Sequence, residues 1–213
     1  DVIESRGLGD VYKRQAIPAT QVLVAMYDTG GEDMTVEVRG YQWKWQYKYL
    51  DEDYNRSFSF FSNLATPYSQ ITNRQVKTDT YLLDVDEPLR IPTNRKVRFL
   101  ITSEDVIHAW WVPDFGIKRD AVPGVINDLW TIVPEPGVYR GQCTELCGQD
   151  HGFMPIVVEV LPEDEFDSWY SGRVQTGLAK KAAENSNQQI AANATQPSSV
   201  NLKPDSADVS GGL

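Results

Sequence analysis

Hydrophobic and polar side chains alternate in the middle of the chain. In residues 43–49, Trp or Tyr occupies every odd position and Lys or Gln occupies every even position. A period of two is typical of a β-strand with one buried face. Similar patterning predicts further strands at Thr35–Arg39, Tyr81–Val85, Val97–Thr102, Leu129–Val133, Val138–Cys143 and Pro155–Leu161.

Turn residues separate these segments. They occur at Glu87-Pro88, Ile91-Pro92, Pro123-Gly124 and Glu135-Pro136-Gly137. Short strands divided in this way are typical of an antiparallel sandwich or barrel, so the expected fold class is all-β. One short helix is expected after the last strand, at Glu163–Tyr170, with Pro162 near its first turn.

The two ends of the chain lack the strand pattern. Residues 1–15 have no clear period, and we interpret them as a segment that is either flexible or unrelated to the rest. Residues 171–213 contain no aromatic residue and are rich in Ala, Asn, Gln and Ser. That composition predicts a low-complexity, disordered tail, in which a short helix around Gly177–Asn187 is the alternative.

Composition narrows the classes of partner. The 213 residues include 30 acidic and 20 basic side chains, which gives a formal net charge of −10. The negative charge lies on residues 16–170, because the two ends are close to neutral. Nucleic acids and anionic membrane surfaces are bound through Lys and Arg, so we expect neither, and a basic protein is the favoured partner. No apolar run approaches the roughly 20 residues that span a bilayer.

The scarce metal-binding side chains lie close together. The chain contains two cysteines and two histidines. Cys143, Cys147, His151 and Met154 fall in one loop between two predicted strands, and His108 is expected at the end of an earlier strand. Loops at one end of a sandwich converge, so His108 can reach this loop. Thiolate, imidazole and thioether together suit copper better than zinc, because Met is a poor zinc ligand.

Four kinds of site compete for these residues. Cys143 and Cys147 could form a disulfide. Two Cys and two His could hold a structural zinc ion, although zinc motifs usually bring their ligands in two close pairs. A mononuclear blue-copper site needs one Cys, two His and a weak Met, which leaves one Cys unused. A pair of coppers that share both sulfurs uses every ligand, and its expected chemistry is electron transfer without bond making.

The loop 143–155 resembles the copper loop of subunit II of haem–copper cytochrome c oxidases. It reads Cys-x-Glu-x-Cys-Gly-x-x-His-x-x-Met-Pro. The resemblance runs from about Ile17 to Tyr170 and includes the motifs Gly40–Trp45, Val106–Trp110 and Asp120–Gly124. It implies a cupredoxin-like Greek-key β-sandwich or barrel over residues 35–170 that holds a dinuclear copper centre, CuA.

The resemblance also implies a role for each ligand. Cys143 and Cys147 would bridge both coppers, His108 and Met154 would complete one copper, and His151 and the main-chain carbonyl of Glu145 would complete the other. The Glu145 side chain would reach a magnesium ion at the boundary with subunit I. Its alternative interpretation is a solvated loop acid.

Cytochrome c recognition is implied at two kinds of residue. Trp43 matches the exposed tryptophan through which cytochrome c passes its electron, whereas we expect Trp45, Tyr47 and Tyr49 to be core aromatics. The carboxylates expected to face the lysine rim of cytochrome c are Asp86, Asp105, Asp51, Glu52 and Asp53. Lys48 departs from the family, which often has an acid at that position.

The function that the resemblance implies is acceptance of electrons by an aerobic terminal oxidase. The domain would pass electrons from cytochrome c to haem in subunit I, beside subunit III, and would consume no oxygen by itself. The implied location is the periplasmic face of a bacterial inner membrane rather than a mitochondrial one, with residues 16–34 as the exit of transmembrane helices absent from this chain. Two alternatives are the copper domain of a nitrous-oxide reductase and a copper carrier. No Cys-x-x-Cys-His haem motif occurs in residues 171–213.

Overall fold

The computed structural model describes residues 2–51, 53 and 56–194. The chain divides into two units, Asp1–Gly177 and Leu178–Leu213. The strands all belong to the first unit, and the described part of the second unit is helical.

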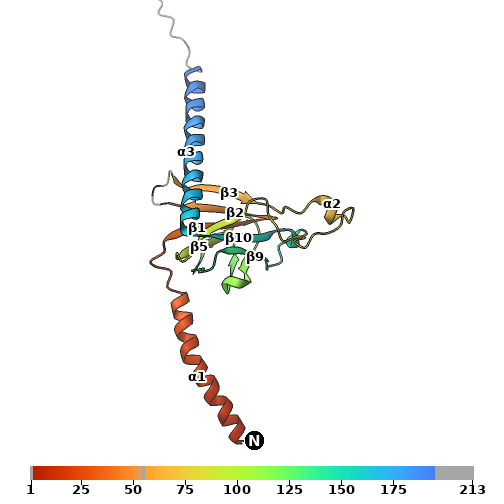
Figure 1. The fold of residues 1–213 in the computed structure, drawn as a ribbon, viewed down its shortest axis with the longest axis vertical. Helices are drawn as coiled ribbons and strands as arrows, with labels where there is room; N and C mark the ends of the chain where they lie inside the picture. The colour runs from red at the N-terminus through yellow and green to blue at the C-terminus, as the bar shows by residue number, and fades with distance from the viewer. Residues whose placement is uncertain (1, 52, 54–55, 195–213) are drawn as a thin grey trace, which may run out of the picture. The chain divides into compact units, whose positions relative to one another are not determined.

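Two five-stranded sheets form the body of the first unit (Figure 1). One sheet has the order β3-β2-β1-β5-β8 and the other the order β4-β10-β9-β6-β7. The first consists of β1 (Met34–Tyr41), β2 (Lys44–Leu50), β3 (Phe58–Ser62), β5 (Val97–Ser103) and β8 (Asn127–Thr131). The second consists of β4 (Leu89–Pro92), β6 (His108–Val112), β7 (Ile117–Ala121), β9 (Gly137–Cys143) and β10 (Pro155–Leu161). The expected all-β fold class is confirmed.

The core follows from the alternation in β2. Trp45, Tyr47 and Tyr49 are fully buried, as expected for core aromatics, and the polar residues between them are partly exposed. β1 alternates in the same way, and so does β5 up to Ile101, after which its last two residues are also buried. Trp43 precedes β2, in the turn after β1, and is only partly buried. The turn therefore separates Trp43 from the three aromatics that continue its sequence pattern.

The strand pairing differs from the prediction in two places. β1 runs parallel to β5, with Met34 opposite Val97, and β4 runs parallel to β10. The remaining pairs within the two sheets are antiparallel. A purely antiparallel sandwich was therefore the wrong expectation, because local periodicity does not record the direction of a distant partner strand.

Some predicted strand positions were wrong. Residues 81–85 form no regular strand, and only Val85 makes an isolated bridge, to Leu64. Ile91-Pro92, interpreted as a turn, ends the edge strand β4, where a proline needs no ladder donor. His108 begins β6 rather than ending a strand. β3, β7 and the strand that follows His108 in β6 were not predicted.

The helices are longer than the sequence pattern suggested. α3 begins at the expected Glu163 but continues to Ala194, through a segment that we expected to be disordered. Strong helix formers such as Ala, Lys and Gln fill that segment. α1 (Val2–Met26) covers most of the end that we interpreted as flexible, and α2 (Tyr68–Ile71) is a single turn. Among the described helices, none combines the length and apolar character needed to cross a membrane. The tail after residue 194 lies outside the described residues.

Candidate metal centre

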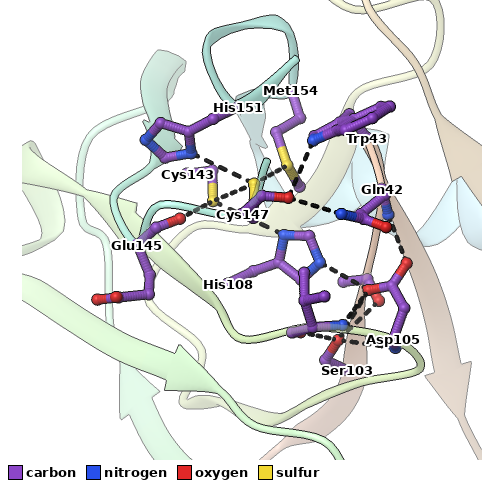
Figure 2. A network of polar contacts seen from close by, with 12 residues as sticks. Gln42, Trp43, Ser103, Asp105, His108, Cys143, Glu145, Cys147, His151 and Met154 are labelled. Carbon is purple, nitrogen blue, oxygen red and sulfur yellow. Dashed lines mark hydrogen bonds and ion pairs between the residues drawn. The ribbon is translucent and has the colours of Figure 1, made fainter. Parts of the chain in front are cut away.

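The ligand candidates gather where β6 begins and β9 ends. Pairing of β6 with β9 sets Trp110 opposite Cys143, so the start of β6 faces the loop that follows Cys143. Figure 2 shows His108 on one side of that loop and His151 and Met154 on the other, with the two sulfur atoms of Cys143 and Cys147 between them. The convergence expected of the five residues is therefore present.

The ligand atoms lie at short, similar separations. The Sγ atoms of Cys143 and Cys147 are 3.8 Å apart, and His108 Nδ1 is 3.9 Å from Cys143 Sγ. Cys147 Sγ lies 3.3 Å from His151 Nδ1 and 3.6 Å from Met154 Sδ. The carbonyl oxygen of Glu145 is 3.4 Å from Cys143 Sγ. All of the expected donors therefore form one connected cluster.

These separations fit ligands arranged around metal. Bonds of about 2.0–2.3 Å at tetrahedral angles place neighbouring ligand atoms about 3.3–3.8 Å apart. A disulfide needs its sulfurs about 2.05 Å apart, whereas these are 3.8 Å apart and both cysteines are free. The ligand atoms of His108, Cys143 and Cys147 all lie within 4.8 Å of one another. The donor set is therefore suited to a soft metal ion.

His108 is held in one orientation by its second ring nitrogen. The imidazole is fully buried, and Nε2 lies 2.9 Å from Asp105 Oδ1. This contact turns Nδ1 toward Cys143, an arrangement that commonly orients histidine ligands of metals. Burial lowers the pKa of His108, but hydrogen bonds with Cys143 and Asp105 outweigh it and raise the pKa above its usual value.

The two thiols differ in acidity. Burial raises the pKa of Cys143, but hydrogen bonds, led by the one to His108, outweigh it and bring the pKa below its usual value. Burial, followed by repulsion from Cys143, raises the pKa of Cys147 to about 12. Of the two thiols, Cys143 is therefore the more acidic.

The turn between β1 and β2 closes over the loop, and sequence reasoning missed most of its contacts. The carbonyl oxygen of Cys147 accepts hydrogen bonds from Gln42 Nε2 at 2.8 Å and Trp43 Nε1 at 3.2 Å. Trp45 Nε1 donates to the carbonyl oxygen of Met154 at 3.3 Å. Gln42 lies inside the motif Gly40–Trp45, but nothing in its spacing indicated a contact with a residue 105 positions away.

Two glycines make room for this close packing. A Cβ at Gly40 would lie 2.7 Å from His108 Cδ2, which is closer than side chains pack. Gly148 has a φ of +116°, and a Cβ there would lie 3.0 Å from Gln42 Nε2. Gly40 therefore needs to be glycine for steric reasons, whereas Gly148 needs it for its backbone conformation.

The remaining site predictions fall in different places. Glu145 is exposed on the loop, and its carbonyl rather than its carboxylate belongs to the cluster. Asp86 is exposed and accepts two hydrogen bonds from Asn63, directly after β3. The end of β3 lies beside the start of β2, so Asp86 lies at the metal end of the first sheet.

The other acids do not form one patch. Asp105 touches the ligand cluster through His108. Asp51 and Asp53 follow β2, whose seven residues separate them from Trp43 by about 20 Å. Asp51 accepts hydrogen bonds from the main chain of Asp53 and from the Tyr170 hydroxyl. Glu52 lies outside the described residues.

Two sheets with buried thiols, imidazole and thioether at one end define a cupredoxin-like domain with a candidate metal centre. The family model "Cytochrome C oxidase subunit II, periplasmic domain" matches residues 34–161. The chain belongs to this family. Its range contains the five side chains of the cluster.

Curated relatives and solved structures agree with this assignment. Proteins described as probable cytochrome c oxidase subunit 2 are 44% identical over 179 residues in both Rickettsia felis and Rickettsia bellii. Each alignment covers 84% of this chain, but only 52% and 61% of the respective relative. The chain therefore spans little more than half the length of these relatives.

Two crystal structures of subunit II resemble the fold. The periplasmic domain of cytochrome oxidase subunit II (CoxB) of Bradyrhizobium japonicum has a TM-score of 0.59 and 39% identity, covering 71% of this chain and 98% of that one. A mixed disulfide intermediate between thioredoxin-like TlpAs and subunit II has a TM-score of 0.54 and 36% identity, covering 70% and 97%.

Proposed function

We propose that this chain accepts electrons from cytochrome c for an aerobic cytochrome c oxidase, at a dinuclear copper (CuA) centre within residues 35–170. The observation that carries the proposal is the cluster of five soft side chains and one carbonyl, joined by separations of 3.3–3.9 Å. When bound, the copper pair would supply one-electron redox chemistry between cytochrome c and haem in subunit I.

The chain's own residues would hold and enclose the metals. Cys143 and Cys147 would be shared by both ions, His108 and Met154 would serve one, and His151 with the Glu145 carbonyl the other. Cys143, Cys147 and Met154 are each no more than 5% exposed, so the protein excludes water from the sulfur ligands. A dry, preformed ligand set limits the rearrangement that accompanies a change of charge.

Trp43 is our candidate for the point at which electrons arrive. Its indole is only partly buried and donates a hydrogen bond to the carbonyl oxygen of Cys147. It therefore connects the surface with the main chain of a ligand. Asp86 and Asp105, both near this end, would attract the basic surface of cytochrome c, whereas Asp51 and Asp53 would contribute only through longer-range steering.

The face toward subunits I and III is proposed from exposed apolar side chains around the metal loop. Leu146 is 78% exposed and Ile107 is 45% exposed. Ile126, 67% exposed, belongs to the loop that bridges to Ser103 through Pro123. Glu145 stands beside Leu146 and would hold magnesium at the boundary with subunit I. The proposed location is the periplasmic face of a bacterial inner membrane.

Copper loading tests the proposed centre. The loaded protein should bind two coppers per chain, be purple, and give the multi-line paramagnetic spectrum of an electron shared by both metals. Met154→Leu should alter that spectrum while keeping the fold, because the substitution conserves volume. Met34→Leu is the matched control and should leave the spectrum unchanged. A colourless protein with one tightly bound zinc would contradict the proposal.

Electron delivery tests the role of Trp43. Trp43→Gln removes the indole but keeps an N–H donor, so it should slow electron uptake from reduced cytochrome c and preserve the copper spectrum. Tyr68→Gln, at a residue that is 72% exposed on α2, is the control and should not change the rate. An unchanged rate in Trp43→Gln would refute the role.

Thiol–disulfide exchange is a second proposed activity of the cysteine pair. The solved relative in a mixed disulfide with a thioredoxin-like protein supports it. In this chain, Cys143 and Cys147 are reduced with their sulfurs 3.8 Å apart, so a small loop movement would allow them to bond. We propose that a thioredoxin-like protein keeps the pair reduced before copper binds. Oxidised protein should take up copper only after a dithiol is added.

A further inference from the structure

Gln42 connects both arms of the metal-binding cluster. Its main-chain N–H donates to Asp105 Oδ2 at 2.7 Å, and Asp105 Oδ1 lies 2.9 Å from His108 Nε2. Its side-chain Nε2 donates to the carbonyl oxygen of Cys147 at 2.8 Å. Figure 2 shows Gln42 between Asp105 and the Cys147 carbonyl. One exposed turn residue therefore links a histidine ligand on β6 with a cysteine ligand in the loop after β9.

The loop is shaped to receive this side chain. Gly148, next to Cys147, has a φ of +116°, and a Cβ there would lie 3.0 Å from Gln42 Nε2 and 3.1 Å from Trp43 Cζ2. A side chain at Gly148 would strain the backbone, and Gln42 and Trp43 would have to move back by a few tenths of an ångström, so the loop lies tightly against both residues. The Cys147–Gly148 peptide therefore contacts Gln42 in two ways, by a hydrogen bond at the Cys147 carbonyl and by close packing at Gly148.

We infer that Gln42 is a positioning residue, whose side-chain amide holds the Cys147–Gly148 peptide in its metal-binding conformation. The inference rests on the proposed function, because it concerns the ligands of the same copper centre. It adds a separate role for a residue that does not itself provide a ligand atom.

The physical effect is to hold the loop before the metal arrives. The Cys147 carbonyl has two donors, and Trp43 Nε1 at 3.2 Å makes the longer contact. Loss of the Gln42 donor leaves this carbonyl with the weaker contact alone. Cys147 Sγ is connected with His151 and Met154, so movement of its peptide displaces the donors on that side of the cluster.

The test compares Gln42→Met with the wild-type chain. Methionine has a similar shape but no N–H donor, and the main-chain bond to Asp105 remains. Gln142→Met is the matched control, because Gln142 is exposed and immediately precedes Cys143. Gln42→Lys restores a donor on a long side chain. The readouts are copper loss to a chelator and hydrogen exchange of the His151 amide, which donates to the Gly148 carbonyl at 3.3 Å.

The expected change is that of one hydrogen bond. Copper loss and, in metal-free protein, exchange of the His151 amide should both be about threefold to tenfold faster in Gln42→Met. Gln42→Lys should return both rates toward wild type, Gln142→Met should not change them, and the melting temperatures should stay close together. Wild-type rates in Gln42→Met, or no recovery in Gln42→Lys, would overturn the inference.

The hydrogen-exchange measurement separates this inference from the proposed function. It is made without copper, so a failure to bind two coppers would refute the proposed centre without deciding the role of Gln42. Normal copper binding with an unchanged His151 amide would refute the role of Gln42 alone. Neither readout involves cytochrome c, so an effect of Gln42 on docking cannot produce either result.

Discussion

Gly40→Ala should damage the fold and the metal site together. Gly40 lies on β1, opposite Trp45 on one side and Ser103 on the other. An added Cβ would lie 2.7 Å from His108 Cδ2, 3.0 Å from Cγ and 3.2 Å from Cβ. Either β1, β6 or the His108 imidazole must therefore move.

The surroundings leave little space for such a movement. The His108 ring is fully buried, with Trp45 against its edge at a centroid distance of 5.9 Å and Asp105 at Nε2. The carbonyl of Gly40 accepts hydrogen bonds from Ser103 Oγ and the Glu104 N–H, which hold the strand in place. The added methyl group is consequently expected to displace His108 from its contact with Cys143.

The magnitude follows from the cost of overpacking. Forcing a methyl group into a filled core costs about 1–3 kcal/mol. Reduced freedom of the unfolded chain offsets this cost by about 0.4–1 kcal/mol. A net loss of about 1–2 kcal/mol should lower the melting temperature by about 2–8 °C in a protein of this size. Displacement of the imidazole should also weaken copper binding.

Calorimetry and copper titration of the full chain measure the two effects. Gly137→Ala is the control, because its Cβ would meet Tyr139 at an ordinary 3.7 Å and should not lower stability. Wild-type stability and copper affinity in Gly40→Ala would refute the steric reasoning. An equal loss in Gly137→Ala would show that glycine replacement in a strand, rather than contact with His108, causes the effect.

Three further substitutions test the core, a surface ion pair and docking. Tyr49→Phe should cost about 1–3 kcal/mol in urea unfolding, because its buried hydroxyl pairs with both the N–H and the C=O of Arg90. Asp167→Asn should cost less than about 1 kcal/mol at pH 7, because its two-bond pair with Arg95 is exposed. Arg95 lowers the pKa of Asp167, so this stabilisation is present above about pH 4 and is lost as the pH falls through the lowered pKa. Unfolding measured at several pH values should show that the stability difference between Asp167→Asn and the wild type vanishes in acid. Asp86→Asn should raise the KM for cytochrome c at low salt and have little effect at high salt, and an increase that persists at high salt would contradict a docking role.

The site could be predicted further than the fold, for physical reasons. Four of the five candidate side-chain ligands lie within twelve consecutive residues, Cys143–Met154, so local spacing alone brought them together. His108 was added because the chain has only two histidines. The sequence contains no comparable signal for the parallel pairing of β1 with β5, because Met34 and Val97 meet only after the chain has crossed between the sheets.

Secondary structure was predicted best where one face is buried and the other is wet. β2 has this pattern, and its three core aromatics were identified correctly. β4 has three buried residues out of four, so it shows no alternation, and its final Pro92 suggested a turn. The extent of α3 was missed because low aromatic content was taken as disorder, although Ala-rich sequence also favours a helix.

The polar contacts around the ligands were beyond prediction because they join distant segments. Gln42 and Asp105 are 63 positions apart, and both were interpretable only as surface residues. In the structure, Asp105 accepts hydrogen bonds from the main-chain N–H groups of Gln42 and Val106 and contacts His108. A docking role requires only an exposed negative charge, so it does not account for these three contacts of the Asp105 carboxylate.

This arrangement changes how the acids at the metal end should be compared. A substitution at Asp105 removes charge from the proposed docking surface and also releases His108, so a slower reaction with cytochrome c has two physical origins there. Asp86 lies at the same end but bonds only to Asn63 in the contacts described, and it has no link to a ligand. Asp86 consequently reports on docking charge alone. If both acids changed the KM for cytochrome c but only Asp105 changed copper retention, the two roles of Asp105 would be separated within one pair of variants.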